Sequence, residues 1–308
     1  MDDVVLDPDV AAGLEALPPF TFDASSLAAS RSNRAAMVFP DLSDRVERTD
    51  HVVRDDPKLV VRVHRPLDVD GPLPCVYWMH GGGYIIGTCR IDDPRFDAWA
   101  PAMPCVGVSV EYRLAPDTPF PGPLDDCDEG LRWTFEHHDE LGVDPGRIGI
   151  GGLSAGGGLA AALAVLARDR GELELSFQLL ECPMLDDRQQ TSSSRRDDLP
   201  IWSRESNTFG WRCYLGDLYG TGDVPPLAAA ARVEDLSGLP PAFVIVGGAD
   251  GFRDEDIEYA LRLGQAGVQT ELHVLPGAPH GVGMFVGSGP AERWSALVDD
   301  WLSRQLRR

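Results

Sequence analysis

Residues 152–156 read Gly152-Leu153-Ser154-Ala155-Gly156, and this stretch decides the fold. It follows a short apolar run at residues 147–151 and opens a helix-like segment at residues 157–168. A Gly-x-Ser-x-Gly between a strand and a helix is typical of a nucleophile elbow, where the serine sits on a strained turn that only very small neighbours permit. The pattern alone is weak in a chain rich in glycine and serine, so its context has to carry the interpretation.

A second glycine-rich motif, His80-Gly81-Gly82-Gly83, closes another apolar run at residues 75–79. Such a loop presents backbone N–H groups to a developing oxyanion, and a side chain there would block the approach of the substrate. We expect the donors to be the N–H groups of Gly82 and Gly83 together with that of Ala155, which follows the serine. Losing one such donor typically costs about 2.7–4 kcal/mol in the transition state, against about 1 kcal/mol for an ordinary hydrogen bond in folding.

Ser154 needs a base and an orienting acid, which in this arrangement follow it in the order acid, then histidine. Two histidines follow Ser154, and His273 lies within a strand candidate, whereas His280 lies on a loop just after the last strand. We therefore take His280 as the base. Asp250 is the first carboxylate after the preceding strand and is predicted to orient the imidazole. The acids at 254–256 suit the first turn of a helix, where the helix dipole favours them.

The remaining chain alternates strand and helix candidates. Short amphipathic segments at residues 10–17 and 26–37 are broken by prolines at 18, 19 and 40, and a hairpin is predicted from residues 52–53 and 59–64. Apolar strands are predicted at 75–79, 106–110, 148–151, 175–180, 242–246 and 270–275, with helices at 125–137, 157–168, 254–266 and 297–306. Apolar strands that alternate with helices predict an α/β fold with a mainly parallel sheet covered on both faces.

One segment, residues 184–239, shows no clear strand. It begins polar and then carries aromatic residues at roughly helical spacing. Two interpretations stay open: an insertion that forms a lid with the N-terminal segment, or a helix packed on the main domain without touching substrate. As candidate pocket walls we take aromatic residues of this segment and of the glycine loop, with two residues just after the base: Tyr84, Trp202, Phe209, Trp211, Tyr214, Met284 and Phe285.

Together these motifs resemble the hormone-sensitive-lipase-like family of α/β-hydrolase esterases, in particular bacterial acetyl esterases of the heroin-esterase kind. The resemblance covers nearly the whole chain after about residue 50 and rests on residues 80–84, 111–116, 152–157, 250–255 and 276–281. It implies an α/β-hydrolase fold in a single domain over residues 1–308, with a cap from about 1–48 and about 186–225. It also implies a homodimer, a triad of Ser154, Asp250 and His280, and an oxyanion hole of Gly82, Gly83 and Ala155.

Three positions depart from the pattern of that family. Leu153 stands where the family often has Asp, Gly251 follows the acid where Pro is usual, and Asp256 ends a block that commonly ends in Gly. None of these departures removes a catalytic group. They bear on the subgroup and on the fine substrate preference.

The net charge and the cysteine content limit which binding partners and which cellular location we expect for this chain. The 308-residue chain has a net charge of −22 at pH 7, which argues against nucleic acid and anionic membranes because both repel it. No two of the six cysteines have metal-ligand or redox spacing, so we predict reduced thiols and no metal site. The start lacks the basic region and apolar core of a signal peptide, and the longest apolar stretch, residues 153–167, is too short to span a bilayer. We therefore expect a cytoplasmic protein.

Other functions fit these residues less well. Gly149-Ile150-Gly151 invites a dinucleotide fingerprint, but Ser154 stands at its last glycine position, and no lysine follows the glycines as a phosphate loop requires. A non-catalytic small-molecule receptor on this fold would have lost a triad member, and a serine triad also cleaves activated amides and thioesters. Since no exposed apolar run of a lipase is evident, we predict a carboxylesterase for small-molecule esters with acetyl to about hexanoyl chains, which needs no cofactor.

Overall fold

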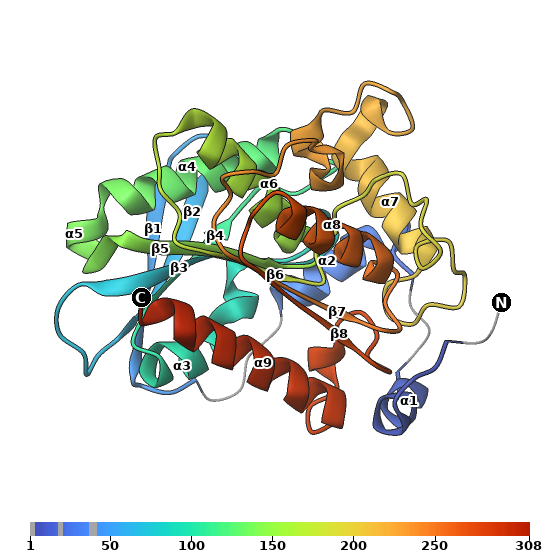
Figure 1. The fold of residues 1–308 in the computed structure, drawn as a ribbon, viewed down its shortest axis with the longest axis horizontal. Helices are drawn as coiled ribbons and strands as arrows, with labels where there is room; N and C mark the ends of the chain where they lie inside the picture. Colours follow the sequence, from blue (N-terminus) through green and yellow to red (C-terminus); the bar gives the residue numbers. More distant parts are fainter. Residues whose placement is uncertain (1–3, 18–20, 37–41) are drawn as a thin grey trace.

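The computed structural model describes residues 4–17, 21–36 and 42–308 and is built on one central sheet (Figure 1). The eight strands lie in the order β1-β2-β4-β3-β5-β6-β7-β8. Their bounds are β1 Val46–Arg54, β2 Leu59–Pro66, β3 Leu73–Met79, β4 Val106–Glu111, β5 Val143–Leu153, β6 Gln178–Glu181, β7 Ala242–Gly247 and β8 Thr270–Leu275.

The sheet is mainly parallel, as the sequence predicts. Strands β3 to β8 run parallel, while the β1–β2 hairpin and the β2–β4 pair are antiparallel. Every residue of β3 and β7 is buried, which explains why these strands are apolar throughout rather than alternating. The α/β class and the hydrolase strand arrangement are therefore confirmed.

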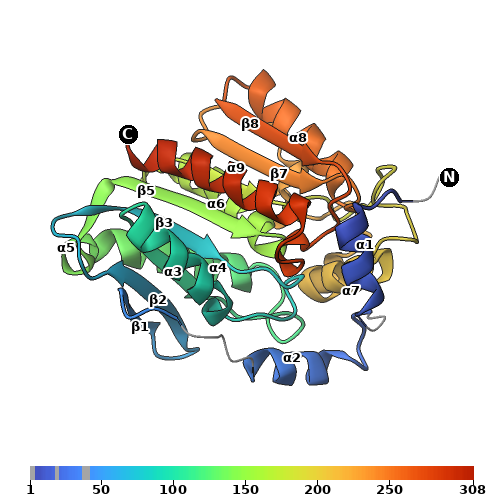
Figure 2. The same ribbon diagram turned by 90° about the horizontal axis from the view of Figure 1, so that it is seen from below.

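Helices cover both faces of the sheet (Figures 1 and 2). One core cluster packs α4, α6 and α8 on one face, and a second packs α3 and α9 on the other. The helices are α1 Pro8–Glu15, α2 Leu27–Ala35, α3 Asp93–Ala102, α4 Gly122–Glu136, α5 His138–Leu141, α6 Ala155–Arg170, α7 Arg204–Leu215, α8 Arg253–Gln265 and α9 Gly289–Leu306.

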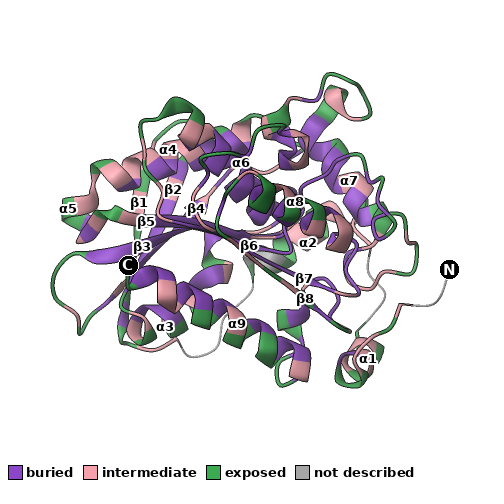
Figure 3. Cartoon of the chain, viewed as in Figure 1, coloured by how far each residue is buried: buried purple, intermediate pink, exposed green. Residues whose placement is uncertain are grey.

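Burial is deepest along the inner strands β3, β4, β6 and β7 and in α6 (Figure 3). Twelve residues of α6 are buried, because its alanines and glycines let it approach the sheet closely, and this matches the predicted core helix. All six cysteines are buried and free, as expected. In the described part of the chain, no helix combines the length and the apolar character needed to cross a bilayer.

Several elements begin or end elsewhere than predicted, β5 at Val143 rather than 148 among them, and one helix was missed. Helix α3 was not predicted, because it contains Pro94 and Pro101, and proline usually interrupts a helix. Helix α9 begins at Gly289 rather than 297, since the Ser288 hydroxyl caps it by accepting from the N–H of Ala291 and a proline follows at its start. Strand β6 begins at Gln178 rather than 175.

The N-terminal segment and the region before β7 meet at the end of the sheet where the parallel strands finish (Figure 2). The Phe22 N–H donates to the Ser206 hydroxyl of α7 at 2.9 Å, and the Phe22 and Trp202 rings lie 5.3 Å apart. Arg31 of α2 donates to the carbonyl of Ile85 at 2.8 Å. The predicted helix breaks at prolines 18, 19 and 40, and the predicted end of the second helix at residue 37, lie outside the described residues.

Candidate active site

Ser154 occupies the sharp turn between β5 and α6, with φ 57° and ψ −119°. This backbone conformation is sparsely populated by residues other than glycine and marks a strained turn. A Cβ on Gly152 would lie 2.2 Å from the carbonyl oxygen of Gly156, and one on Gly156 would lie 2.0 Å from that of Met79. Both glycines of the motif are therefore required by close backbone packing, as a nucleophile elbow demands.

The structure brings Ser154, His280 and Asp250 together. His280 Nε2 lies 2.9 Å from Ser154 Oγ, and His280 Nδ1 lies 2.7 Å from Asp250 Oδ2. All three side chains are buried, and the loops that carry Asp250 and His280 follow β7 and β8. Because those strands are parallel, both loops reach the same edge of the sheet as Ser154. With its Nδ1–H donated to Asp250, His280 presents Nε2 to accept the serine proton.

The other carboxylates near Asp250 are directed elsewhere. Asp254 accepts from the N–H of Ser193 at 2.8 Å, and Glu255 accepts from the N–H of Leu185 at 2.9 Å. Neither oxygen of Asp256 has a hydrogen-bond partner among the described residues. Burial raises the pKa of both Glu255 and Asp256 well above the usual range. Of the carboxylates in the described ranges, only Asp250 bonds to His280, while His273 pairs with Glu271 on β8 at 2.9 Å.

The glycine loop lies against the serine. A Cβ on Gly81 would lie 3.5 Å from Cβ of Ser154, and Gly82 and Gly83 have φ of 128° and 59°. The left-handed φ of these two residues favours glycine. The loop is fixed from below by Tyr112, whose hydroxyl donates to the His80 carbonyl at 2.7 Å and whose ring stacks on the His80 ring at 4.2 Å. His80 therefore anchors the glycine loop to Tyr112.

The seven candidate pocket residues fall into different places. Trp202 lies beside the site: a Cβ on Gly83 would meet its Cη2 at 2.2 Å, and its ring lies 6.3 Å from the His280 ring. Tyr84, Trp211 and Tyr214 are fully buried, and the Tyr84 ring stacks on Tyr214 at 3.9 Å, so they join α7 to the glycine loop within the core.

Of the remaining three candidates, Met284 lies beside the residue that follows the base, since a Cβ on Gly281 would lie 3.7 Å from its sulfur. Phe209 is partly buried against the core, and Met284 is exposed. Phe285 packs on α1, where a Cβ on Gly13 would lie 2.7 Å from its ring. For these residues a role in binding substrate stays a prediction.

Trp202, a predicted pocket residue, ends a short strap, residues 199–202, whose other residues were missed by the sequence patterns. A Cβ on Gly251, next to the acid, would lie 2.8 Å from Leu199, and a Cβ on Gly281, next to the base, would lie 3.6 Å from Ile201. Ile201 has φ 67°, a strained value for a β-branched residue. The strap therefore contacts the neighbours of the acid and the base, and Trp202 at its end contacts the glycine loop. The segment contains no local motif that could have revealed these contacts.

Cys182, together with Asp250 and His280, forms a group of side chains close enough together to hold a metal ion. Its sulfur, an Asp250 oxygen and a His280 nitrogen lie within 4.8 Å of one another. Burial raises the pKa of the Cys182 thiol well above its usual range, so the thiol keeps its proton. Both His280 nitrogens already face Asp250 and Ser154, which leaves this set better suited to proton transfer than to metal binding.

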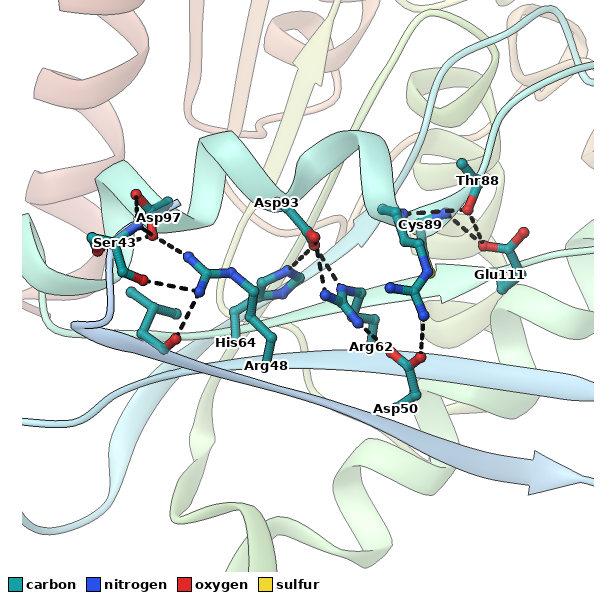
Figure 4. A network of polar contacts seen from close by, with 12 residues as sticks. Ser43, Arg48, Asp50, Arg62, His64, Thr88, Cys89, Asp93, Asp97 and Glu111 are labelled. Carbon is teal, nitrogen blue, oxygen red and sulfur yellow. Dashed lines mark hydrogen bonds and ion pairs between the residues drawn. The ribbon is translucent and has the colours of Figure 1, made fainter. Parts of the chain in front are cut away.

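A second buried histidine–aspartate pair lies under α3, away from these loops (Figure 4). His64 Nε2 lies 2.8 Å from Asp93 Oδ1, and Arg62 binds both Asp93 oxygens at 2.7 and 3.0 Å. Burial lowers the pKa of His64, whose ring stacks on Phe96. No serine hydroxyl in the described part of the chain is bonded to this histidine.

The chain is similar to several known proteins. A family described as "alpha/beta hydrolase fold" matches residues 76–284. The carboxylesterase NlhH of Mycobacterium tuberculosis is 40% identical over 233 residues, which cover 75% of this chain and 73% of that protein. The ethyl acetate hydrolase of Pseudomonas putida is 29% identical over 312 residues, covering 95% and 96%.

A solved bacterial heroin esterase is 42% identical, covers 99% of both chains and superposes with a TM-score of 0.93. The family match covers residues 76–284, most of the chain, and the identity of 40% to NlhH extends over three quarters of it. The chain therefore belongs to the alpha/beta hydrolase fold family, among its hormone-sensitive-lipase-like esterases.

Proposed function

We propose that this chain is a serine carboxylesterase that hydrolyses short-chain acyl esters, acetyl to about hexanoyl, through an acyl-serine intermediate. The observation that carries the proposal is the unbroken hydrogen-bonded chain from Ser154 through His280 to Asp250 beside the glycine loop. Nucleophile, base and orienting acid in this order are the parts that acyl transfer requires.

The reaction follows from the positions of these atoms. Ser154 Oγ attacks the ester carbonyl carbon while His280 Nε2 takes its proton, and Asp250 stabilises the imidazolium. The C–O bond to the alcohol then breaks, and His280 gives its proton to the departing alkoxide. Water next attacks the acyl-serine, passes a proton to His280 and releases the carboxylic acid, while Oγ recovers its proton.

The oxyanion formed in both halves of the reaction needs fixed donors. In our proposal these are the N–H groups of Gly82, Gly83 and Ala155. The contact of Gly81 with Ser154 and the anchoring of His80 by Tyr112 support it, because they hold the loop rigidly next to the nucleophile. Preorganised donors of this kind are usually the largest single contribution to acyl-transfer catalysis.

The preference for short chains rests on the cap. We propose that residues from about 1–48 and about 186–225 cover the site of a single-domain enzyme. The Phe22–Trp202 contact and the bond from the Phe22 N–H to Ser206 support this, since they join the N-terminal segment to the region whose Trp202 lies against Gly83. The name of the similar ethyl acetate hydrolase is consistent with a small acyl group.

The test is hydrolysis of p-nitrophenyl esters from acetyl to decanoyl by the wild type and Ser154→Ala. We expect turnover to peak at short chains and to vanish in Ser154→Ala. Trp202→Ala should raise kcat/KM for decanoate relative to acetate by roughly 10-fold, because it opens the wall beside Gly83. Folded wild type without turnover on any ester would favour the non-catalytic receptor, and turnover confined to thioesters or amides would favour those substrates.

The remaining features of the proposal concern assembly and partners. A net charge of −22 disfavours nucleic acid and anionic membranes, so we propose a small-molecule ester as the partner. A homodimer and a cytoplasmic location rest on resemblance and composition. Light scattering of the purified protein would decide the first, and fractionation of cells that express it would decide the second.

A further inference from the structure

The backbone of Ser154 is held by the turn that follows β6. The Ser154 N–H donates to the Glu181 carbonyl at 2.8 Å, and the Met184 N–H donates to the Ser154 carbonyl at 2.9 Å. Between them, Cys182 has a left-handed φ of 36° and donates its N–H to Ile245 of β7 at 2.7 Å. The position of the candidate nucleophile therefore depends on where this turn lies.

The Glu181 side chain ties the same turn to the helices under the sheet. Its carboxylate is buried and accepts from Trp294 Nε1 of α9 at 2.7 Å. It also forms an ion pair with Arg95 of α3. The Arg95 guanidinium lies 4.4 Å from the centre of the Trp78 ring and 4.8 Å from that of Trp99. One carboxylate thus joins α3, α9 and the turn that holds the serine.

Stability alone gives little reason for this arrangement. Removing two charges from water costs several kcal/mol per ion, and apolar residues of similar size are often as stable. A carboxylate held from two sides, however, fixes the turn in one position. Misplacing a reacting group by about 1 Å can cost roughly 100-fold in rate, so a fixed position has a large catalytic value.

We propose that Glu181 is a positioning residue: its carboxylate, held by Arg95 and Trp294, sets the place of the Ser154 hydroxyl relative to His280 and the glycine loop. The inference rests on the proposed esterase function. Glu181 touches no reacting atom itself. It acts through its backbone carbonyl, which receives the Ser154 N–H, and through the turn to Met184.

The test uses Glu181→Gln, which keeps an oxygen acceptor for Trp294 but removes the charge that pairs with Arg95. Active sites are first counted by titration with a p-nitrophenyl alkylphosphonate, so that rates refer to folded, reactive enzyme. We expect kcat for p-nitrophenyl acetate and the rate constant of phosphonylation to fall roughly 10- to 100-fold, with KM unchanged. Trp294→Phe removes one donor to the carboxylate and keeps an aromatic ring, so a smaller fall in both rates is expected.

Glu271→Gln is the matched control. Glu271 lies on β8 and also pairs with a residue of α9, Arg304 at 2.9 Å, but it bonds to no backbone group of the serine turn. We expect this variant to keep the wild-type kcat and phosphonylation rate even if its melting temperature falls.

Two results would overturn the inference. In the first, titrated Glu181→Gln and Trp294→Phe both keep the wild-type kcat and phosphonylation rate, whatever their melting temperatures. In the second, Glu271→Gln slows the reaction as much as they do. Wild-type protein that takes no phosphonyl group on Ser154 would overturn the proposed function, and with it this inference.

Discussion

Two buried histidine–aspartate pairs in this molecule have almost the same length and entirely different surroundings. His280 lies 2.7 Å from Asp250 on loops at the edge of the sheet, whereas His64 lies 2.8 Å from Asp93 between the sheet and α3 (Figure 4). His280 Nε2 meets the Ser154 hydroxyl at 2.9 Å. The second nitrogen of His64 has no partner among the described residues.

A serine is near the second pair as well. Ser109 of β4 lies opposite Arg62 of β2, on the sheet face that also carries His64, yet its hydroxyl has no hydrogen-bond partner among the described residues. In the register of β2 and β4, Ser109 lies opposite Arg62 while Gly107 lies opposite His64, so strand pairing does not set the serine directly against the histidine. The presence of serine, histidine and aspartate is therefore not sufficient, because placement on loops decides whether they connect.

The two aspartates also differ in what else they bind. Arg62 donates to both oxygens of Asp93, so the negative charge of this aspartate is already neutralised. Among the described residues, the other oxygen of Asp250 accepts only from the N–H of Phe252, at 3.0 Å. The charge of Asp250 is thus available to an imidazolium at His280, while burial lowers the pKa of His64 and keeps that ring neutral.

The largest expected effect separates the two histidines. His280→Ala should lower kcat by roughly 10⁴- to 10⁶-fold, because the serine loses its base. His64→Phe should leave kcat/KM unchanged, because its ring bonds to Asp93 and packs on Phe96, and neither contact involves Ser154. Steady-state kinetics on p-nitrophenyl acetate measures both. A large loss of kcat in folded His64→Phe would contradict the distinction between the two pairs.

The aspartates give the next effect. Asp250→Asn should lower kcat by about 10⁴-fold, since an amide at this place favours the wrong histidine tautomer. Asp93→Asn should instead lower the free energy of unfolding by about 3 kcal/mol, because it weakens the pairing of buried Arg62, and leave kcat unchanged. Urea denaturation combined with kinetics checks both variants, and equal losses of activity would refute the comparison.

The sequence predicted the connected set because its members lie in local patterns. Ser154 stands in a Gly-x-Ser-x-Gly, and Asp250 and His280 each follow an apolar strand, so parallel strand order alone brings them to one edge. The parallel sheet was predictable for the same reason, from runs such as residues 75–79 and 242–246.

What the sequence could not show are contacts between distant segments that no motif encodes. The strap at 199–202 meets Gly83, Gly251 and Gly281 only through the tertiary fold. Trp211 was predicted as a pocket wall from helical spacing, and the structure packs it near Tyr84 in the core. Spacing alone does not say which partner a buried face meets, so its role in binding substrate stays a prediction.

The third effect concerns stability and pH. Burial holds the pKa of His64 below its ordinary 6.5, against the opposing influence of Asp93, while Arg62 and Arg48 act in the same direction as burial. Below pH 6.5 the unfolded chain therefore binds a proton at residue 64 before the folded chain does, so stability falls as pH falls. His64→Phe should cost about 1–3 kcal/mol at pH 8 through the lost bond to Asp93, and should lessen the further loss toward pH 5. Thermal unfolding at both pH values measures this, and an unchanged pH slope would show that His64 is not the group responsible.

The smallest effect concerns Asp256, a buried aspartate that, within the described residues, is bonded to neither a histidine nor an arginine. Burial raises the pKa of Asp256 well above 3.8, and its two oxygens have no hydrogen-bond partner among the described residues. As pH rises above about 4, the unfolded chain loses this proton while the folded chain retains it, so Asp256 destabilises the fold increasingly toward neutral pH. Asp256→Asn does not titrate and should raise the melting temperature at pH 8 by roughly 2–4 °C, equivalent to about 1 kcal/mol, with no gain at pH 4. Calorimetry at the two pH values decides the point, since an equal change at both would mean that the charge of Asp256 is not the cause.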